Sequence, residues 1–263
     1  MFARTDPSPL IMVAPKGARR SKADHPQLPL SIEEIRDETV ACAHAGAKAL
    51  HLHVRDETGA HALDAGLYRE AIEEIHDALP GFPIQVTTES AGIFDVDAQF
   101  RCLRALRPEA ASISVREIAR SPDLAPEVYG FCEAESVAVQ HILYDERDWH
   151  RLEAWRASGI VRRGQDDVIF VLGTYAPPKA ASLEALRALA MLFEKNPGRS
   201  MVCAFGASEH KILRAAAALG ADLRVGFENN IHEPDGTLAK SNAANVARLK
   251  SALSPLQTIG KAR

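Results

Sequence analysis

The sequence predicts a (β/α)8 barrel, in which eight parallel strands alternate with eight helices. Short apolar, β-branched runs alternate strictly with longer stretches of helical period along nearly all 263 residues. Strict alternation calls for a parallel sheet, and eight such units at this length fit one closed barrel. A doubly wound open sheet would bring a glycine-rich phosphate turn after the first strand, and APKGARR at 14–20 lacks that pattern. We therefore expect residues 1–263 to form a single barrel domain.

The strands are expected where apolar runs are short and end in polar or turn-forming residues. The first is LIMVAP, the second is ALHLHV, and the last, DLRVGF, precedes a polar ENN segment. The predicted strands cover residues 10–15, 49–54, 84–88, 111–115, 138–144, 167–173, 200–205 and 222–227.

The helices are expected between these strands, and several carry capping signals. Ser31 is followed three residues later by Glu34, the pattern of a capping box, and Ser182 precedes the amphipathic run LEALRALAMLFEK. Glycines follow three of the helical segments, where a left-handed residue would end a helix: Gly46, Gly159 and Gly220. The predicted helices cover residues 31–46, 66–79, 95–106, 123–135, 147–158, 182–195, 208–219 and 242–253.

Composition excludes several classes of protein. With 46% hydrophobic and 25% charged residues the chain can bury a large core, and a net charge of −4 without a dense basic block argues against nucleic acid as a partner. The four cysteines lie far apart, so neither a disulfide framework nor a thiolate zinc site is predicted. The apolar run before Pro15 is too short for a signal peptide or a spanning helix, so we expect a cytoplasmic protein without a membrane partner.

Two histidines in the second strand point to a metal ion. Side chains alternate across a strand, so His51 and His53 share the face opposite to Leu50 and Leu52. If the leucines pack on helices, both imidazoles face into the barrel, where burial requires a metal or a polar network to satisfy them. A lone core histidine is more often a hydrogen-bonded structural residue, but a pair near the end of a barrel strand favours a metal.

A third donor follows the last strand. Glu228 comes directly after the run RVGF, at the end of the barrel where active sites of this fold lie. Two imidazole nitrogens and one carboxylate leave coordination positions open and suit catalytic Zn²⁺ or Fe²⁺ acting as a Lewis acid. Without the histidines, Glu228 would read as an ordinary carboxylate of a surface loop.

Four segments in this order resemble one known family, the β-keto acid cleavage enzymes, which include 3-keto-5-aminohexanoate cleavage enzymes. They are APKGARRSKADHPQLPLSIEEI, AGAKALHLHVRDETG, RPEAASISV and LRVGFENN, and the likeness runs from the first strand to the last helix. The resemblance implies a (β/α)8 barrel with one Zn²⁺ per subunit, bound by His51, His53 and Glu228. It implies an acyltransferase that converts a β-keto acid and acetyl-CoA into acetoacetate and a new acyl-CoA, by a Claisen condensation run partly in reverse.

The same resemblance suggests roles for further residues. Arg224 is similar to the family arginine that acts beside the catalytic base. It lies an even number of residues before Glu228, so its side chain is expected on the same inward face, where it needs an anionic partner. Thr87, Thr88 and Ser114 resemble hydroxyl positions that hold the substrate. Arg55 and Asp56 complete the motif HxHxRD, and we expect them to support the metal ligands or the following loop.

The chain departs from the family pattern after Glu228, where many members carry an aspartate base and this sequence has Asn229. An amide cannot take a proton at neutral pH. Glu89 is one candidate for a replacement base, and Asp145 and Glu146 are others, although each also reads as an ordinary loop carboxylate. Asn229 remains a candidate site residue.

The loop after the first strand is basic and can attract the phosphates of CoA or a substrate carboxylate; it can equally be a solvated loop. Its cations are Lys16, Arg19, Arg20 and Lys22, of which Arg19 is our candidate for substrate binding. The absence of an acid in VAPKGARR favours a neutral or anionic keto acid over a cationic one.

Two other functions compete. A metal-dependent hydrolase also uses an HxH strand, but on strand one and with ligands on later strands, where His141 is the only histidine. A non-catalytic, metal-binding barrel that lost its base at Asn229 is the other alternative. The resemblance also implies a homo-oligomer, with a tetramer favoured.

Overall fold

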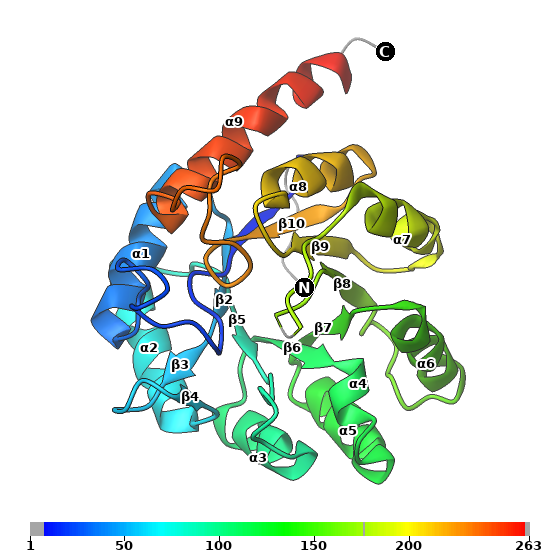
Figure 1. Ribbon diagram of the computed structural model, residues 1–263. Helices are drawn as coiled ribbons and strands as arrows, with labels where there is room; N and C mark the ends of the chain where they lie inside the picture. The colour runs from blue at the N-terminus through cyan, green and yellow to red at the C-terminus, as the bar shows by residue number, and fades with distance from the viewer. Residues whose placement is uncertain (1–7, 176, 261–263) are drawn as a thin grey trace.

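Eight parallel strands close into a barrel in the order β1-β10-β9-β8-β7-β6-β5-β2, and β1 pairs with both β10 and β2 (Figure 1). The computed structural model describes residues 8–175 and 177–260. All eight predicted strands are confirmed, most of them one or two residues shorter than predicted. They are β1 (Ile11–Val13), β2 (Ala49–Leu52), β5 (Ile84–Thr87), β6 (Ala110–Ser114), β7 (Ala138–Leu143), β8 (Asp167–Leu172), β9 (Ser200–Ala204) and β10 (Asp222–Val225).

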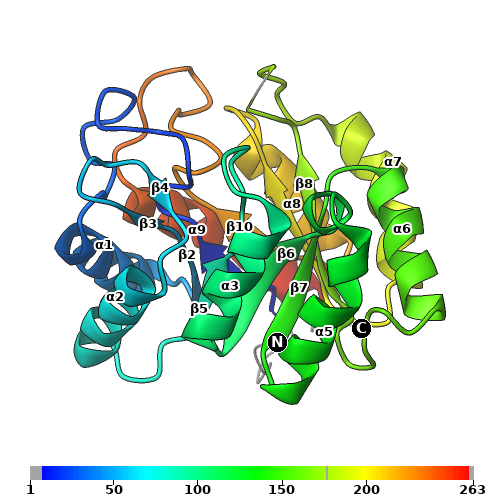
Figure 2. The same ribbon diagram turned by 90° about the horizontal axis from the view of Figure 1, so that it is seen from below.

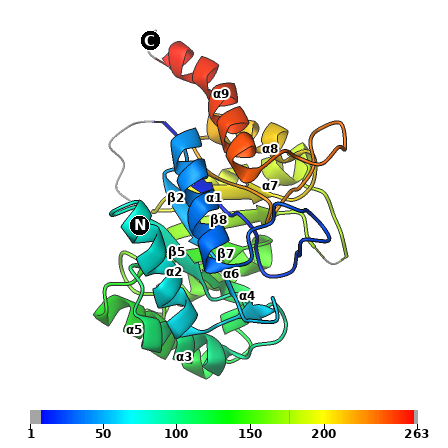
Figure 3. The same ribbon diagram turned by 90° about the vertical axis from the view of Figure 1, so that its left-hand side faces the viewer.

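The predicted helices surround the barrel, and Figure 3 shows α1 between α2 and α9, where the ring of helices closes. At α1, Ser31 Oγ accepts from the Glu34 amide and Glu34 Oε2 accepts from the Ser31 amide, as a capping box requires. Ser182 caps α7 through the amide of Ala185. The helices are α1 (Ile32–Ala45), α2 (Ala65–Ala78), α3 (Val96–Leu106), α5 (Ala125–Ala134), α6 (Glu146–Ala157), α7 (Leu183–Lys195), α8 (Glu209–Ala218) and α9 (Asn242–Gly260).

Several short elements were not predicted. The strand expected over 49–54 breaks after Leu52, and the chain continues into a two-stranded hairpin of β3 (Val54–Arg55) and β4 (His61–Ala62). A short helix, α4 (Val115–Ile118), and a 3-10 turn, η1 (Pro122–Leu124), follow β6. These elements are too short to show a periodic hydrophobic pattern, which is why the sequence does not reveal them.

The strands separate two apolar regions. Outward-facing residues such as Leu50, Leu52 and Val225 pack on the helices, whereas Met12, Ile169 and other inward-facing residues fill the barrel. Figure 2 shows the loops that follow β1, β8 and β10 on one side of the barrel, where the strands end. Among the described residues, we find no helix with the length and apolar composition needed to cross a bilayer.

Candidate metal centre and active site

His51 and His53 lie at the carboxyl end of β2 and are almost completely buried, each with 1% of its surface exposed. Leu50, Leu52 and Val54 pack in the region between strands and helices. The alternation predicted from the sequence is therefore confirmed, and both imidazoles are directed to the inside of the barrel. The two rings lie edge to face with their centroids 5.0 Å apart.

A glutamine orients His51. Gln85 of β5 accepts a hydrogen bond from His51 Nδ1 through its Oε1, at 2.8 Å, and its own amide donates to Gln140 Oε1 on β7 at 3.1 Å. With the Gln85 amide donating to Gln140, its oxygen faces His51, and this arrangement of the two amides assigns the His51 proton to Nδ1. The lone pair of Nε2 is then free for a metal, as in metal-binding histidines held by an outer partner.

Glu228 follows β10, which pairs with β1 on the side opposite to β2, and its carboxylate lies close to both histidines. Its Oε2 lies 3.6 Å from His51 Nε2 and 3.6 Å from His53 Nε2. Its other oxygen, Oε1, accepts from Arg224 Nη2 at 3.1 Å. The loop after β1 covers this carboxylate closely: a Cβ at Gly17, where φ is +69°, would lie 2.5 Å from Glu228 Cγ.

The donor atoms fit a divalent ion. His51, His53 and Glu228 each offer one ligand atom, and these atoms lie within 4.8 Å of one another. Several of these buried atoms have no hydrogen-bond partner among the described residues. They are both ring nitrogens of His53 and Oε2 of Glu228. Zinc bonds of roughly 2.0–2.1 Å place tetrahedral ligands about 3.3 Å apart, close to the 3.6 Å between Glu228 Oε2 and the Nε2 atom of each histidine. A cation here would give a partner to Glu228 Oε2 and to the Nε2 atom of His53, which lies 3.6 Å from that oxygen.

Burial governs the electrostatics of the site. Desolvation holds the pKa of His51 and of His53 well below the ordinary value, with Arg224 adding to the effect at His51. Both imidazoles are therefore neutral, the form in which they bind metals. Burial also raises the pKa of Glu228, and the neighbouring Arg224 opposes that rise.

A cavity of about 270 Å³ opens beside His51 and Glu228 at the ends of the strands. Arg19, Thr87, Glu89 and Arg224, four of the predicted site residues, line it together with His51 and Glu228. Glu89 Oε2 lies 3.9 Å from His53 Nε2. Burial and the nearby Glu228 carboxylate raise the pKa of Glu89 to about 7.

The chain matches the model of the beta-keto acid cleavage enzyme family over residues 9–258, which is nearly its whole length. It belongs to this family. It is 29% identical over 251 residues to a 3-keto-5-aminohexanoate cleavage enzyme of Fusobacterium nucleatum, with 91% of this chain and 89% of that protein covered. It is 28% identical to a 3-oxoadipate:acetyl-CoA acetyltransferase of Cupriavidus necator, with 97% and 93% covered.

Solved structures agree on the fold of this family member. The ternary complex of ObcA with a C4-CoA adduct and oxalate superposes with a TM-score of 0.69 at 16% identity, covering 88% of this chain and 65% of that longer chain. The 3-dehydroquinate dehydratase of Geobacillus kaustophilus superposes with a TM-score of 0.63 at 15% identity, covering 95% and 92%. At these identities the likeness concerns the barrel alone.

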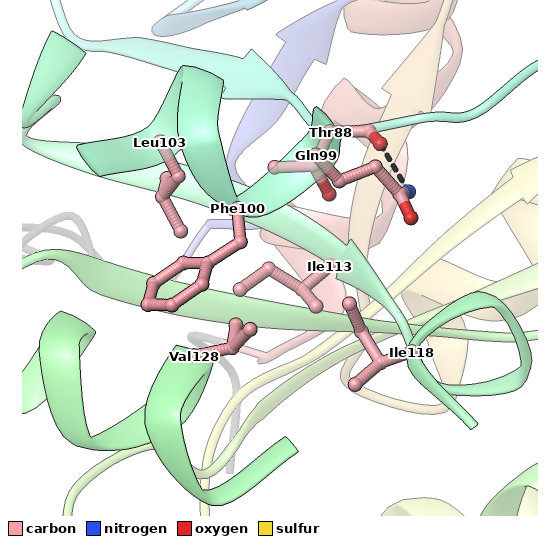
Figure 4. A pocket seen from close by; sticks show the side chains of 7 residues that line it. All are labelled: Thr88, Gln99, Phe100, Leu103, Ile113, Ile118 and Val128. Carbon is pink, nitrogen blue, oxygen red and sulfur yellow. Dashed lines mark hydrogen bonds between the residues drawn. The ribbon is translucent and has the colours of Figure 1, made fainter. Parts of the chain in front are cut away.

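Thr88 lies outside the site, contrary to the prediction. Figure 4 shows it beside Gln99 in a small pocket between the barrel and α3, together with Phe100 and Ile113. Its hydroxyl donates to the carbonyl of Ser112 at 2.9 Å. Adjacent residues of a strand face opposite ways, so only Thr87 of the pair can reach the cavity. Ser114 is directed inward at the end of β6 and is buried, with no partner for its hydroxyl among the described residues.

Asn229, at the position where many family members have an aspartate, is fully buried and does not line the cavity. Its backbone forms part of the turn after β10: the amide donates to Gly226 O at 2.9 Å and the carbonyl accepts from Gly206 N at 3.2 Å. Among the described residues, nothing bonds to its side-chain amide.

The basic loop after β1 is largely tied to the protein. Lys16 is buried with its Nζ 3.5 Å from Leu30 O, and Lys22 pairs with Glu34, so neither is presented to a ligand. Arg19 remains exposed at the rim of the cavity. Arg55 of the HxHxRD motif holds this loop by donating to Gly17 O and Arg20 O at 2.7 and 3.0 Å.

Two acids predicted as alternative bases to Glu89, together with Asp56 of the HxHxRD motif, lie outside the cavity. Asp145 caps α6 and lies 2.9 Å from Arg116 Nη2. Glu146 is the first residue of that helix and is exposed. Asp56, which we expected to support the metal ligands or the following loop, accepts from the amides of Thr58 and Ala60 and so fixes the hairpin turn. None of these acids lines the cavity.

Several residues of the site were not predicted from the sequence. Gln85, which orients His51, could have been found from its parity with Thr87 in the run IQVTT. Tyr175 comes from the loop after β8, and its hydroxyl donates to the backbone carbonyl of Glu228. Tyr144 and Arg116 also line the cavity, and the Arg116 guanidinium lies 4.2 Å from the centre of the Tyr144 ring. Loop contacts of this kind carry no sequence signal.

Proposed function

We propose that this protein is a zinc-dependent β-keto acid cleavage enzyme that transfers an acyl group to CoA. The substrates would be a β-keto acid and acetyl-CoA, the two reactants in the names of the relatives. The products would be acetoacetate and a new acyl-CoA. The observation that carries the proposal is the trio of buried donors of His51, His53 and Glu228 beside an open cavity, with His53 Nε2 and Glu228 Oε2 lacking a hydrogen-bond partner among the described residues. Zinc bound there would act as a Lewis acid on the keto oxygen of the substrate.

We assign the role of general base to Glu89. Its carboxylate lines the cavity next to His53, whereas Asn229 does not line the cavity and cannot accept a proton. The carboxylate of Glu89 would take a proton from C2 of the β-keto acid, and the resulting enolate would attack the thioester carbonyl of acetyl-CoA and expel the CoA thiolate. Addition of this thiolate to C3 and cleavage of the C2–C3 bond leave the electron pair on C2. Glu89 then returns the proton, which gives acetoacetate and the acyl-CoA.

Other side chains would bind and orient the reactants. Arg224 pairs with the Glu228 carboxylate and lines the cavity, so its remaining N–H groups are available to an oxyanion. Thr87 and Ser114, both directed inward, are proposed to hold the substrate. Arg19 at the rim is proposed to attract the anionic CoA. A homo-oligomer, with a tetramer favoured, remains our expectation.

Metal analysis combined with an activity assay tests the proposal. Purified protein should contain about one zinc per chain. With acetyl-CoA and a panel of β-keto acids, mass spectrometry should detect acetoacetate and the matching acyl-CoA in equal amounts. Metal-loaded protein that turns over none of the panel would instead support the alternative of a non-catalytic, metal-binding barrel.

A further inference from the structure

The residues around the mouth of the barrel form two different halves. The strands β2, β5 and β10 present polar or charged groups, among them the metal donors, Thr87 and Arg224. The strands β7, β8 and β9 present Ile142, Val171 and Phe205, which pack together as part of the inner apolar cluster. The cavity therefore has one catalytic wall and one apolar wall.

The apolar wall lies across the barrel from the metal donors. In the closed order of strands, β8 is four strands from β2 in both directions, so Val171 faces the side that carries His51. The cavity of about 270 Å³ lies between them. A keto acid whose oxygens are held at the donors can extend the rest of its carbon chain across the cavity to Val171 and its neighbours.

Charges near the apolar wall are already compensated. Arg116 is held by Asp148 at 2.7 Å and by Asp145 at 2.9 Å, and the Tyr144 ring covers its guanidinium. The Glu117 carboxylate accepts hydrogen bonds from the Ser90 hydroxyl and amide and from Gln99. A charged substituent directed toward Arg116 and Glu117 would lose its hydration without gaining a free partner, which is costly. The exposed Arg19, which also lines the cavity, lies at its rim beside the Tyr175 ring, where we assign it to CoA.

We infer that the substrate is a β-keto acid whose substituent beyond the keto carbon is uncharged and apolar, and that Ile142, Val171 and Phe205 bind it. This inference rests on the proposed function. It separates this chain from two relatives whose names specify charged substituents, the 3-oxoadipate enzyme and the 3-keto-5-aminohexanoate enzyme.

Three six-carbon substrates test the inference directly. They are 3-oxohexanoate, with a neutral propyl group, 3-oxoadipate, its analogue with a terminal carboxylate, and 3-keto-5-aminohexanoate, its analogue with an amine. The zinc-loaded protein should use 3-oxohexanoate with a kcat/KM at least about tenfold above that for either charged analogue. Preference for a charged analogue would overturn the inference while supporting the proposed function. No turnover of any of the three would overturn both.

A pair of valine variants of β8 tests the assigned wall. Val171→Ala enlarges the cavity and should shift the preferred chain length of neutral keto acids upward by one or two carbons, with a change of about tenfold in the ratio of kcat/KM values. Val168→Ala is the matched control, because Val168 is fully buried on the outer face of the same strand. An unchanged length preference in Val171→Ala, or an equal shift in Val168→Ala, would contradict the assignment.

Discussion

The contact between Glu228 and Arg224 makes a quantitative prediction for the variant Glu228→Gln. The substitution preserves side-chain size but removes the charge that faces the Arg224 guanidinium, which is 3% exposed. Removing one partner of a buried ion pair costs about 3–5 kcal/mol of stability, because the remaining charge is left uncompensated. We expect the metal-free variant to lose about 3 kcal/mol of unfolding free energy, which lowers the melting temperature by about 6–12 °C.

The same variant should bind zinc far more weakly. Changes in outer partners of a metal site cost about 10–100-fold in affinity, and loss of a ligand should exceed that range. Zinc titration against a competing chelator measures the affinity, and urea unfolding of the chelator-treated protein measures the stability. Glu209→Gln is the control: Glu209 is equally buried but accepts from Gly226 N and Asn230, without contacting the metal donors. If Glu228→Gln binds one zinc with unchanged affinity, the carboxylate is not a ligand.

Three further predictions follow from individual contacts. Glu89→Gln should lower kcat by about 100-fold or more at unchanged zinc content, whereas Asp145→Asn should retain activity; equal activity of both variants would exclude Glu89 as the base. His141 is buried with its pKa lowered to about 4, so between pH 6.5 and 4 the unfolded chain binds a proton that the folded chain does not. Its contribution should therefore make the protein about 2 kcal/mol less stable at pH 5 than at pH 7, and His141→Gln should reduce this difference in urea unfolding; an unchanged pH slope would contradict the reasoning. Gly17→Ala should displace the Glu228 side chain and weaken zinc binding measured by titration, since its Cβ would lie 2.5 Å from Glu228 Cγ; wild-type affinity would contradict this.

The barrel and the metal donors could be predicted because both depend on simple periodicities. Alternation of strand and helix fixes the parallel sheet, and alternation within ALHLHV fixes which face holds His51 and His53. Active sites of this fold lie at the carboxyl ends of the strands, so Glu228 after the last strand is expected near the histidines of the second strand. None of these steps required knowledge of a loop conformation.

Loop structure accounts for most of what the sequence did not reveal. The sequence predicts a Lys16 side chain available to an anion, whereas in the structure Lys16 is buried with its Nζ against the Leu30 carbonyl. The misplacement of Thr88 has a different origin. In IQVTT the outward positions of Ile84 and Val86 assign Thr88 to the same outer face, so the parity argument that placed the histidines applied here as well.

The hydrogen bonds from His51 through Gln85 to Gln140 hold His51 in place for an ion. They lie beneath the donors, inside the barrel, and join three strands that are each fixed by backbone pairing. The imidazole therefore has its binding tautomer and rotamer fixed by the strands themselves, and ion binding requires little loss of side-chain entropy. A site prepared in this way favours tight binding with little rearrangement of the surrounding fold.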